Sequence, residues 1–344
     1  MREGSLDQNN RLLTLVQENS ASILCCEINQ TGFESVIGVP CFGNKPSATE
    51  SVCSLLRTID SNVLLIVSLE SYSESEANDF SEKLVNAVRQ LGRVNSLLVI
   101  HHRSVMKLVN HWNFLVECAL TIDGCKHFAW GSDHDIWHPR WYQCNLQIFS
   151  REPECLLAVP PMAIAHQKKK PQLIKIKSIG SESEKNIESA LGQYGPGNSV
   201  YGLFSIAVFK LGLRLNQVLL PDRLLLTLVA LWHPVSYARF ESEPMWTRFE
   251  LQSRTRVLAK QRNTVLNGRF EKMTSYLPWT IVHTVIALRY IPRISRESSV
   301  PIRFLVFRLL AFEVRSEIAH RRKQIRAFRR NLGNRTNLIK VNSK

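Results

Sequence analysis

The sequence lacks the features that would assign it to several narrow classes of protein. Its eight cysteines include no C-x-x-C pair and no His/Cys grouping at zinc-finger spacing, which argues against a thiolate metal site. No stretch reaches the roughly 18 uninterrupted apolar residues of a membrane-spanning helix; the nearest, 273–288, is interrupted by Pro278. Residues 1–17 contain no apolar core of a secretory signal, so we expect a cytoplasmic protein with reduced thiols.

The charge is distributed unevenly along the chain. The 344 residues are 44% hydrophobic and 21% charged, an ordinary globular composition that allows one large domain or two. Residues 251–344 hold 21 basic and 4 acidic side chains, whereas residues 1–250 hold 23 basic and 25 acidic ones. The net charge of +15 therefore resides in the C-terminal quarter, and it bears only on what that quarter contacts.

Short apolar runs alternate with longer helical periods between residues 34 and 130. This alternation is typical of an α/β protein whose sheet is flanked by crossover helices. Ligands of open α/β sheets bind beyond the carboxyl ends of the strands, so we expect a site near the polar loops 41–44, 68–75 and 131–138. The expected strands are 35–40, 62–68, 96–101 and 126–130, and the expected helices are 48–58, 78–91 and 109–120.

The remainder of the chain is expected to be mainly helical. Residues 168–197 are polar and charged, which is typical of a mobile loop over a site and equally of a surface excursion. We therefore divide the chain into an N-terminal arm (1–33), an α/β domain (34–250) and a basic helical region (251–344). The expected helices after residue 197 are 200–211, 221–232, 278–290 and 302–330.

Asp133 and Asp135 directly follow the expected strand 126–130. Two carboxylates at the end of a strand suit Mg²⁺ or Mn²⁺, which prefer carboxylate oxygens and keep open positions for phosphate oxygens. Taken alone, two acids in a turn more often solvate a loop or cap a helix. The apolar strand before the pair and the segment Ile136–Pro139 after it favour the metal site.

The segment His127–Pro139 (HFAWGSDHDIWHP) resembles the strand and D-x-D segment of glycosyltransferase family 2, and in particular a bacterial subgroup of that family. These enzymes have the GT-A fold and use nucleotide-sugar donors. The resemblance covers residues 34–250 and implies a Rossmann-like mixed sheet flanked by helices. Five further segments are similar, in order, to motifs of the family: Gly38–Asn44 (V-P-x-Y-N), Asn110–Asn113 (N-x-N), Tyr201–Phe204 (G-L-F-R), Leu220–Leu225 (P-D-x-x-L-L) and Glu243–Arg248 (E-P-L-x-x-R).

The resemblance implies a role for each matching residue. Asp135 would bind the metal and Asp133 would contact the metal or the ribose. His134 would point away from the metal and pack or meet solvent, and ligation by its imidazole is the less favoured alternative. Asp222 would be the general base that deprotonates the acceptor hydroxyl, although its place after Pro221 fits a helix N-cap equally well. The further donor-binding candidates are Pro40, Phe42, Glu70, Ser71, Arg103 and Asn113.

The loop after the expected strand 62–68 departs from the family pattern. The family has two aspartates there, one of which contacts the base of the nucleotide, whereas this chain reads SLESYS at 68–73. Only Ser71 matches, and Glu70 is the acid that could take the place of an aspartate. The donor nucleotide is therefore open, and a catalytically inactive GT-A-like scaffold is the alternative to an active enzyme.

The basic region has the composition of helices that lie in a membrane interface. Residues 278–330 combine arginines with Trp, Phe, Ile and Leu. Each basic residue near an anionic leaflet contributes about 1 kcal/mol, so we expect peripheral attachment to the inner face of the plasma membrane. Two alternatives remain: the apolar side chains pack on the α/β domain, or the arginines bind nucleic acid, for which no binding module is recognisable.

Together these features predict an inverting, divalent-metal-dependent glycosyltransferase. The expected reaction moves a hexosyl group from a nucleotide-sugar donor to a glycan or a lipid-linked acceptor, as in polysaccharide biosynthesis. Inversion is implied by the resemblance. The rival hypothesis is a scaffold without activity that uses its basic helices to hold a membrane or a partner protein.

Overall fold

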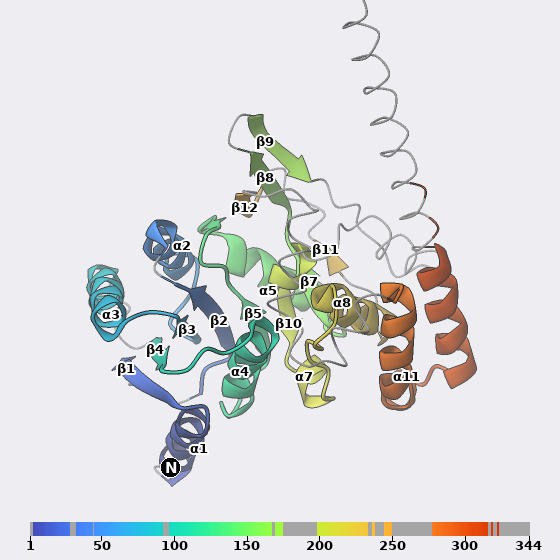
Figure 1. The fold of residues 1–344 in the computed structure, drawn as a ribbon, viewed down its shortest axis with the longest axis horizontal. Helices are drawn as coiled ribbons and strands as arrows, with labels where there is room; N and C mark the ends of the chain where they lie inside the picture. The colour runs from blue at the N-terminus through green and yellow to red at the C-terminus, as the bar shows by residue number, and fades with distance from the viewer. Residues whose placement is uncertain are drawn as a thin grey trace, which may run out of the picture.

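Figure 1 shows the computed structural model of the chain, an α/β protein built around a mixed sheet. The structure describes residues 3–27, 32–43, 45–91, 96–166, 169–174, 198–232, 236–237, 244–249 and 277–315, with residues 318 and 322. Eight strands form the main sheet in the order β1-β4-β3-β2-β5-β10-β7-β11. Their bounds are β1 Ala21–Glu27, β2 Ser35–Phe42, β3 Val63–Glu70, β4 Leu97–His102, β5 His127–Trp130, β7 Leu157–Val159, β10 Leu203–Ser205 and β11 Ser236–Tyr237.

The centre of the main sheet is parallel and buried. β2 pairs in parallel with β3 and β5, and β3 pairs in parallel with β4. Every residue of β3 is buried, as expected for a mostly apolar run in a sheet covered on both faces. β1 is antiparallel to β4, and β10 is antiparallel to β5 and β7, so the sheet is mixed. The predicted α/β class, a mixed sheet flanked by helices, is confirmed.

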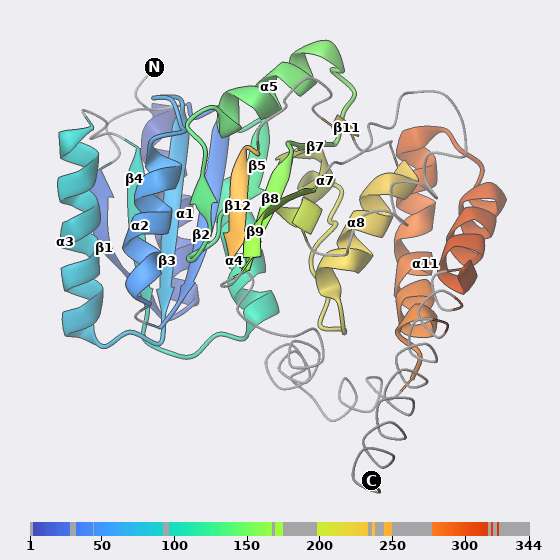
Figure 2. The same cartoon turned by 90° about the horizontal axis from the view of Figure 1, so that it is seen from above.

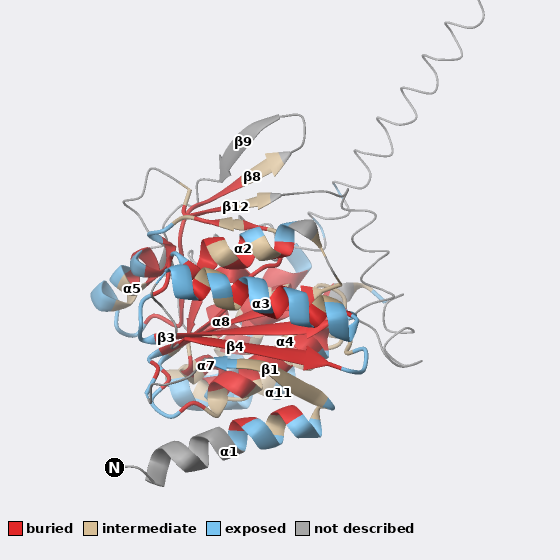
Figure 3. Cartoon of the chain, turned by 90° about the vertical axis from the view of Figure 1, so that its left-hand side faces the viewer, coloured by how far each residue is buried: buried red, intermediate tan, exposed pale blue. Residues whose placement is uncertain are grey.

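Helices cover both faces of the main sheet (Figures 2 and 3). Because successive residues of a strand face opposite sides, a Cβ at Gly38 would meet Leu115 of α4 (Leu108–Leu120). Val39, the next residue of β2, faces the other side of the sheet. Its side chain and Leu55 of α2 (Pro46–Leu56) both lie beside Gly131. The other helices are α1 Glu3–Glu18, α3 Glu74–Gln90, α5 Trp141–Arg151, α7 Ala207–Lys210, α8 Pro221–Trp232, α11 Trp279–Ser298 and the 3₁₀ helix η1 Asn198–Tyr201.

A second, four-stranded sheet has the order β6-β12-β8-β9. β12 is antiparallel to β6, and Trp246 faces Trp137 in that pairing. The two indole rings stack with centroids 5.5 Å apart and an interplanar angle of 18°, so residues from far along the chain are held beside the loop between β5 and β6. The bounds are β6 Ile136–Trp137, β8 Met162–His166, β9 Lys169–Ile174 and β12 Trp246–Phe249.

Two predictions about the secondary structure need correction. The helix predicted at 200–211 is wrong, because this stretch contains the end of η1, strand β10 and the short α7. A three-residue buried strand gives no periodicity that separates it from part of a helix. The polar segment 168–197 begins with β9, which pairs with β8, and residues 175–197 lie outside the described residues. The predicted arm, 1–33, contributes α1 and the edge strand β1.

α11 is packed against α8, and the helix over 302–315 lies beside α11 and reaches Arg223 of α8 through Phe312 and Glu313 (Figure 2). Ala287 and Ile291 of α11, and Leu305 and Leu309 of the helix over 302–315, are at most 1% exposed and belong to the same hydrophobic core as α8. Part of the apolar surface of these helices is therefore packed on the α/β body. This packing was one of the predicted alternatives for the basic region. The boundary at residue 250 stays a prediction, since 251–276 lie outside the described residues.

Candidate functional site

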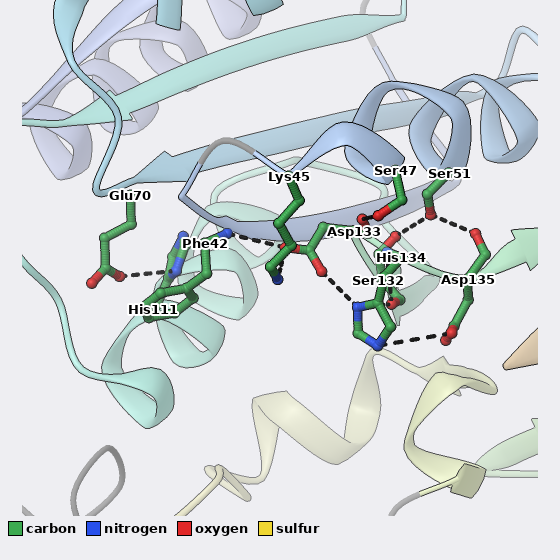
Figure 4. Close-up of polar contacts among 10 residues, drawn as sticks. All are labelled: Phe42, Lys45, Ser47, Ser51, Glu70, His111, Ser132, Asp133, His134 and Asp135. Carbon is green, nitrogen blue, oxygen red and sulfur yellow. Dashed lines mark hydrogen bonds and ion pairs between the residues drawn. The ribbon is translucent and has the colours of Figure 1, made fainter. Parts of the chain in front are cut away.

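The loop from Gly131 to Asp135 joins β5 to β6 and carries both aspartates of the D-x-D segment (Figure 4). The amide N–H of Gly131 donates to the carbonyl of Gly38 at 2.9 Å, which extends the pairing of β5 with β2 into the loop. A Cβ at position 131 would lie 2.7 Å from Val39 Cγ2 and 2.9 Å from Leu55. Glycine therefore lets the loop leave the sheet directly beneath α2.

Serines on one side of α2 hold this loop in place. Ser51 Oγ lies 2.6 Å from the carbonyl oxygen of Ser132 and 2.5 Å from that of Asp135, so it can donate its proton to either. Ser54 Oγ accepts from the backbone N–H of Trp137 at 3.0 Å. Ser47, Ser51 and Ser54 follow an i, i+4, i+7 spacing, which places them on one helix face. These bonds of Ser51 and Ser54 thus fix the loop through its backbone.

Asp133 is a buried carboxylate with protein partners on both oxygens. Its Oδ2 accepts from the backbone N–H of Phe42 at 3.1 Å and from Lys45 Nζ at 2.5 Å. Its Oδ1 lies 2.7 Å from Nδ1 of His134. Burial by itself would raise the pKa of Asp133, but the hydrogen bonds from His134 and Lys45 and the charge of Lys45 hold that pKa below its usual value. Asp133 is therefore ionised at neutral pH.

The position of His134 differs from the predicted one. Its imidazole lies between the two aspartates, with Nε2 3.8 Å from Asp135 Oδ1, instead of pointing away from them (Figure 4). Nδ1 also lies 3.1 Å from Ser132 Oγ, and that hydroxyl accepts from the His134 backbone N–H at 3.3 Å. These local hydrogen bonds direct the ring toward the carboxylates, and a comparison of motifs contains no information about them.

Asp135 is completely buried, and it sits where the second sheet meets the loop. β12 runs antiparallel to β6, with Thr247 opposite Ile136. Arg248, which follows Thr247, is therefore directed toward Asp135, which precedes Ile136. The Arg248 guanidinium lies 5.9 Å from the centre of the Tyr201 ring. Arg248 ends the E-P-L-x-x-R match, and its place explains why that distant segment belongs to the site.

The charges of the three candidate acids all act on the buried side chain of Tyr201. Burial raises the pKa of Tyr201, Arg248 lowers it, and Asp135, Asp133 and Asp222 each raise it further. Tyr201 is 7% exposed and belongs to η1. The loop after β5 and the start of α8 therefore flank one buried side chain.

Asp222 lies in the first turn of α8, which begins at Pro221. Its carboxylate accepts hydrogen bonds from the backbone N–H groups of Arg223 and Asp222, so the helix-capping role stays beside the predicted role of general base. Its Oδ1 is buried and has no hydrogen-bond partner among the described residues. Burial raises the pKa of Asp222, opposed by the backbone N–H groups of Arg223 and Asp222 and by the charges of Arg248 and Arg223. A carboxylate with a raised pKa is a stronger base.

The turn before Asp222 is held by the C-terminal helices. Leu220 has a φ of 56°, in the left-handed region that a leucine rarely adopts. His283 of α11 is fully buried, and its Nε2 donates to the carbonyl of Leu219 at 2.8 Å. Glu313 lies 3.9 Å from both the Arg223 guanidinium and His283 Nδ1. These contacts from α11 and the helix over 302–315 fix the start of α8.

Glu70, the candidate for reading the nucleotide base, is completely buried at the end of β3. Its Oε2 lies 3.1 Å from Nδ1 of His111, whose Nε2 is 2.8 Å from Ser68 Oγ. Ser68 Oγ is in turn 2.8 Å from Nε2 of His102. Burial raises the pKa of Glu70 to about 8 and lowers those of His111 and His102 to about 4. At neutral pH these four side chains are therefore uncharged, with the protonated carboxyl of Glu70 next to Nδ1 of His111.

Replacing Glu70 by glutamine is expected to stabilise the protein at pH 9 more than at pH 5. The folded pKa of Glu70, about 8, exceeds the ordinary value of 4.5, so the wild type loses stability as pH rises between these values. The loss approaches about 1.4 kcal/mol per pKa unit, whereas a glutamine amide keeps a donor toward His111 at every pH. Thermal unfolding at both pH values measures the difference. The control is Glu82→Gln at an exposed position of α3; an equal shift of Glu70→Gln at both pH values would contradict the assignment.

The remaining predicted residues are spread along the carboxyl edge of the sheet. Pro40 is buried in β2, and Ser71, with a φ of 61°, follows β3 at the surface. Arg103 is exposed just after β4. The Asn113 side chain pairs with the backbone of Leu215, donating to its carbonyl at 2.9 Å and accepting from its N–H at 3.1 Å. Their roles in donor binding stay predictions.

Sequence reasoning missed several residues that build the site: Lys45, Ser47, Ser51, Ser54 and His111. Tyr201 and Arg248 were part of the motif matches, but no role was predicted for either. The helical spacing of the serines was a further signal present in the sequence. The others are brought together by the folding of distant segments.

The residues present fit a divalent cation that arrives with a diphosphate. Among the described residues, no three His, Cys, Asp or Glu side chains converge to hold a metal by themselves. Mg²⁺ and similar ions are commonly bound by one or two protein groups, with substrate phosphates and waters completing the shell. The buried Asp135 and the adjacent imidazole supply two such donors.

Comparison of the sequence with known proteins assigns no family to the chain. No protein-family profile matches the sequence. A Dictyostelium discoideum protein described as a probable inactive serine/threonine-protein kinase is 33% identical over 111 residues, which is 30% of this chain. The chain spans only 6% of the length of that relative, so the match assigns no family.

The solved structures similar to this chain include two in complex with a nucleotide sugar. One is S. aureus TarS 1–349 in complex with UDP-GlcNAc, with a TM-score of 0.46 and 11% identity, covering 84% of this chain and 92% of that one. Another is the mannosyltransferase PcManGT from Pyrobaculum calidifontis in complex with GDP-Man and Mn²⁺, with a TM-score of 0.46 and 8% identity, covering 94% and 96%. At these values no residue role is transferred from either protein.

Proposed function

We propose that the protein is an inverting glycosyltransferase that moves a sugar from a nucleotide-sugar donor to a hydroxyl of a glycan or a lipid-linked acceptor. The observation that carries the proposal is that Asp133 and Asp135, in the loop after β5, and Asp222, in the first turn of α8, lie on the two elements that contact η1, which carries the buried Tyr201. Ligands of α/β sheets bind at that edge. The ordered motif matches over residues 34–250 give the reaction class.

In the proposed reaction, Asp222 is the general base. As its carboxylate accepts the proton of the acceptor hydroxyl, the hydroxyl oxygen attacks the anomeric carbon, and the bond to the diphosphate oxygen breaks. Attack opposite the leaving group inverts the configuration. The buried Oδ1 of Asp222 has no competing hydrogen bond among the described residues, which keeps it available for this proton.

The diphosphate would be bound near the loop between β5 and β6. A bound Mg²⁺ or Mn²⁺ supplies positive charge to the leaving diphosphate, worth several kcal/mol in the transition state. Asp135 would hold that ion. Lys45, which ion-pairs with Asp133, is part-exposed just before α2, where its charge and the positive end of the helix dipole favour an anion.

The test is release of nucleoside diphosphate from UDP-, GDP- and TDP-sugars in the presence of Mn²⁺, measured on the full chain with glycan and polyprenyl-phosphate acceptors. We expect release from one nucleotide class and its stimulation by an acceptor. No release from any donor under these conditions would overturn the enzymatic proposal and favour the scaffold hypothesis.

We further propose that the C-terminal helices attach the enzyme peripherally to an anionic membrane. Among the described residues no helix is both long and apolar enough to cross a bilayer. Ile281, Val285 and Leu288 of α11 are 42–54% exposed at an i, i+4, i+7 spacing. Phe307, Leu310 and Val314 repeat that outward pattern at i, i+3, i+7, with 44–68% exposure, and the exposed Arg303 and Arg315 accompany them. An apolar stripe bordered by arginines complements anionic lipid.

The double variant Phe307→Ser/Leu310→Ser is expected to lose at least about tenfold in partition to vesicles, since burying each large side chain contributes about 1.5–3 kcal/mol. Flotation with phosphatidylcholine vesicles, with and without phosphatidylglycerol, measures the partition. Leu91→Ser/Val105→Ser, which also removes exposed apolar side chains, is the matched control. Equal flotation of both variants, or a dimer in solution that depends on Phe307 and Leu310, contradicts this surface.

A further inference from the structure

The imidazole of His134 bridges the two aspartates that flank it in sequence (Figure 4). Nδ1 lies 2.7 Å from Asp133 Oδ1, and Nε2 lies 3.8 Å from Asp135 Oδ1. The first distance is a hydrogen bond, whereas the second is too long for one. The two ring nitrogens therefore have different functions.

The hydrogen bond to Asp133 fixes which nitrogen carries the proton. Asp133 is ion-paired with Lys45, and a carboxylate in that state only accepts hydrogen bonds. Nδ1 of His134 must therefore donate, so a metal ion would bind this ring through Nε2. Nε2 and a carboxylate oxygen of Asp135 lie 3.8 Å apart.

The separation of these two atoms suits one cation between them. Imidazole nitrogen and carboxylate oxygen each bind divalent ions at about 2.0–2.2 Å, so two donors on one ion lie at most about 4.4 Å apart. The observed 3.8 Å falls within this limit without movement of the backbone. The His134 side chain is 31% exposed, whereas the Asp135 side chain is fully buried, so the imidazole is the solvent-accessible member of the pair.

Asp133 supplies the usual support for such a ligand. Histidines that bind metals almost always donate their other ring N–H to a carboxylate or a carbonyl, which fixes the tautomer and raises the basicity of the ligand. Both oxygens of Asp133 are already engaged by Phe42, Lys45 and His134, which removes Asp133 from direct coordination.

We propose that His134 and Asp135 are the protein ligands of the divalent cation and that Asp133 is the outer carboxylate that orients His134. This inference rests on the proposed function for the source of the remaining ligands, the diphosphate oxygens and water. It reverses the roles that the D-x-D resemblance implies for Asp133 and His134. A nitrogen ligand favours Mn²⁺ over Mg²⁺, since Mg²⁺ prefers an all-oxygen shell.

The experiment measures Mn²⁺ binding to the full chain by electron paramagnetic resonance, with UDP or GDP present and absent. Pulsed measurements report modulation from a coordinated imidazole nitrogen directly and need no turnover. His134→Asn is expected to remove that nitrogen signal and to weaken Mn²⁺ binding at least about tenfold. Asp133→Asn keeps an acceptor for Nδ1–H, so the nitrogen signal should persist, with binding weakened by at most about 10²-fold.

Three outcomes would overturn the proposal. The first is that Mn²⁺ bound to the wild type shows no imidazole signal. The second is that the signal persists in His134→Asn and so comes from another histidine. The third is that Asp133→Asn loses the signal while His134→Asn retains full affinity for Mn²⁺. A nitrogen signal that depends on His134, found in a protein that turns over no donor, would support the site and reject the proposed function. The two are thus tested separately.

Discussion

Replacing Asp135 by asparagine is expected to reduce release of nucleoside diphosphate at least about 10²-fold, with the fold intact. The variant removes the charge that holds the cation, and metal stabilisation of a leaving diphosphate is worth several kcal/mol, with each 1.4 kcal/mol giving about tenfold in rate. The loop should keep its shape, because Ser51 bonds the backbone carbonyl of Asp135 and not its side chain.

Initial rates with saturating Mn²⁺ and thermal unfolding curves together check this prediction. Asp123→Asn is the matched control, since it removes an exposed carboxylate of the loop after α4 that lies 3.9 Å from Arg11, at the surface. A rate for Asp135→Asn within a factor of about three of the wild type, at the same Mn²⁺ concentration, would remove the metal from the mechanism.

Asp222→Asn is expected to lower kcat by about 10²- to 10⁴-fold, the range that a positioned general base contributes. The KM for the donor and Mn²⁺ binding should stay near their wild-type values, because Asp222 lies on α8 and not in the loop that holds the ion. Since burial raises the pKa of the Asp222 carboxyl, loss of its charge should not destabilise the protein at pH 8.

The pH profile separates a base from a structural residue. The wild type should lose activity as pH falls through the raised pKa of Asp222, and that acidic limb should be absent from the residual activity of Asp222→Asn. Asp79→Asn, at an exposed position of α3, controls for removal of a carboxylate elsewhere. Unchanged kcat in Asp222→Asn would assign the base to another residue.

The sequence was most informative where the residues form long, regular elements. β2, β3 and β4 were predicted because parallel strands covered on both faces have nearly continuous apolar runs, and α3 because its buried residues recur at helical spacing. β10 escaped detection because three residues carry no period. The strand β1 was not foreseen either, since its pairing with β4 is a tertiary contact.

In the candidate site, too, only some of the residues could be predicted from the sequence. Asp133 and Asp135 were found because a motif places them next to each other at a strand end. The partners that set their chemistry could not be found, because Lys45 and Tyr201 reach the site only through the crossing of β2, α2 and η1 over the sheet edge. The orientation of His134 depends on Asp133 and on the hydroxyl of Ser132, and no spacing rule predicts it.

The contacts between the C-terminal helices and the start of α8 limit how the protein can be dissected. A shortened chain that ends before α11 would lose the imidazole that bonds Leu219 and the carboxylate beside Arg223. The backbone around Leu220 would then relax, and the orientation of Asp222 would change with it. Inactivity of such a fragment would therefore be uninformative about membranes, and only point substitutions on the outward faces of these helices can separate anchoring from turnover.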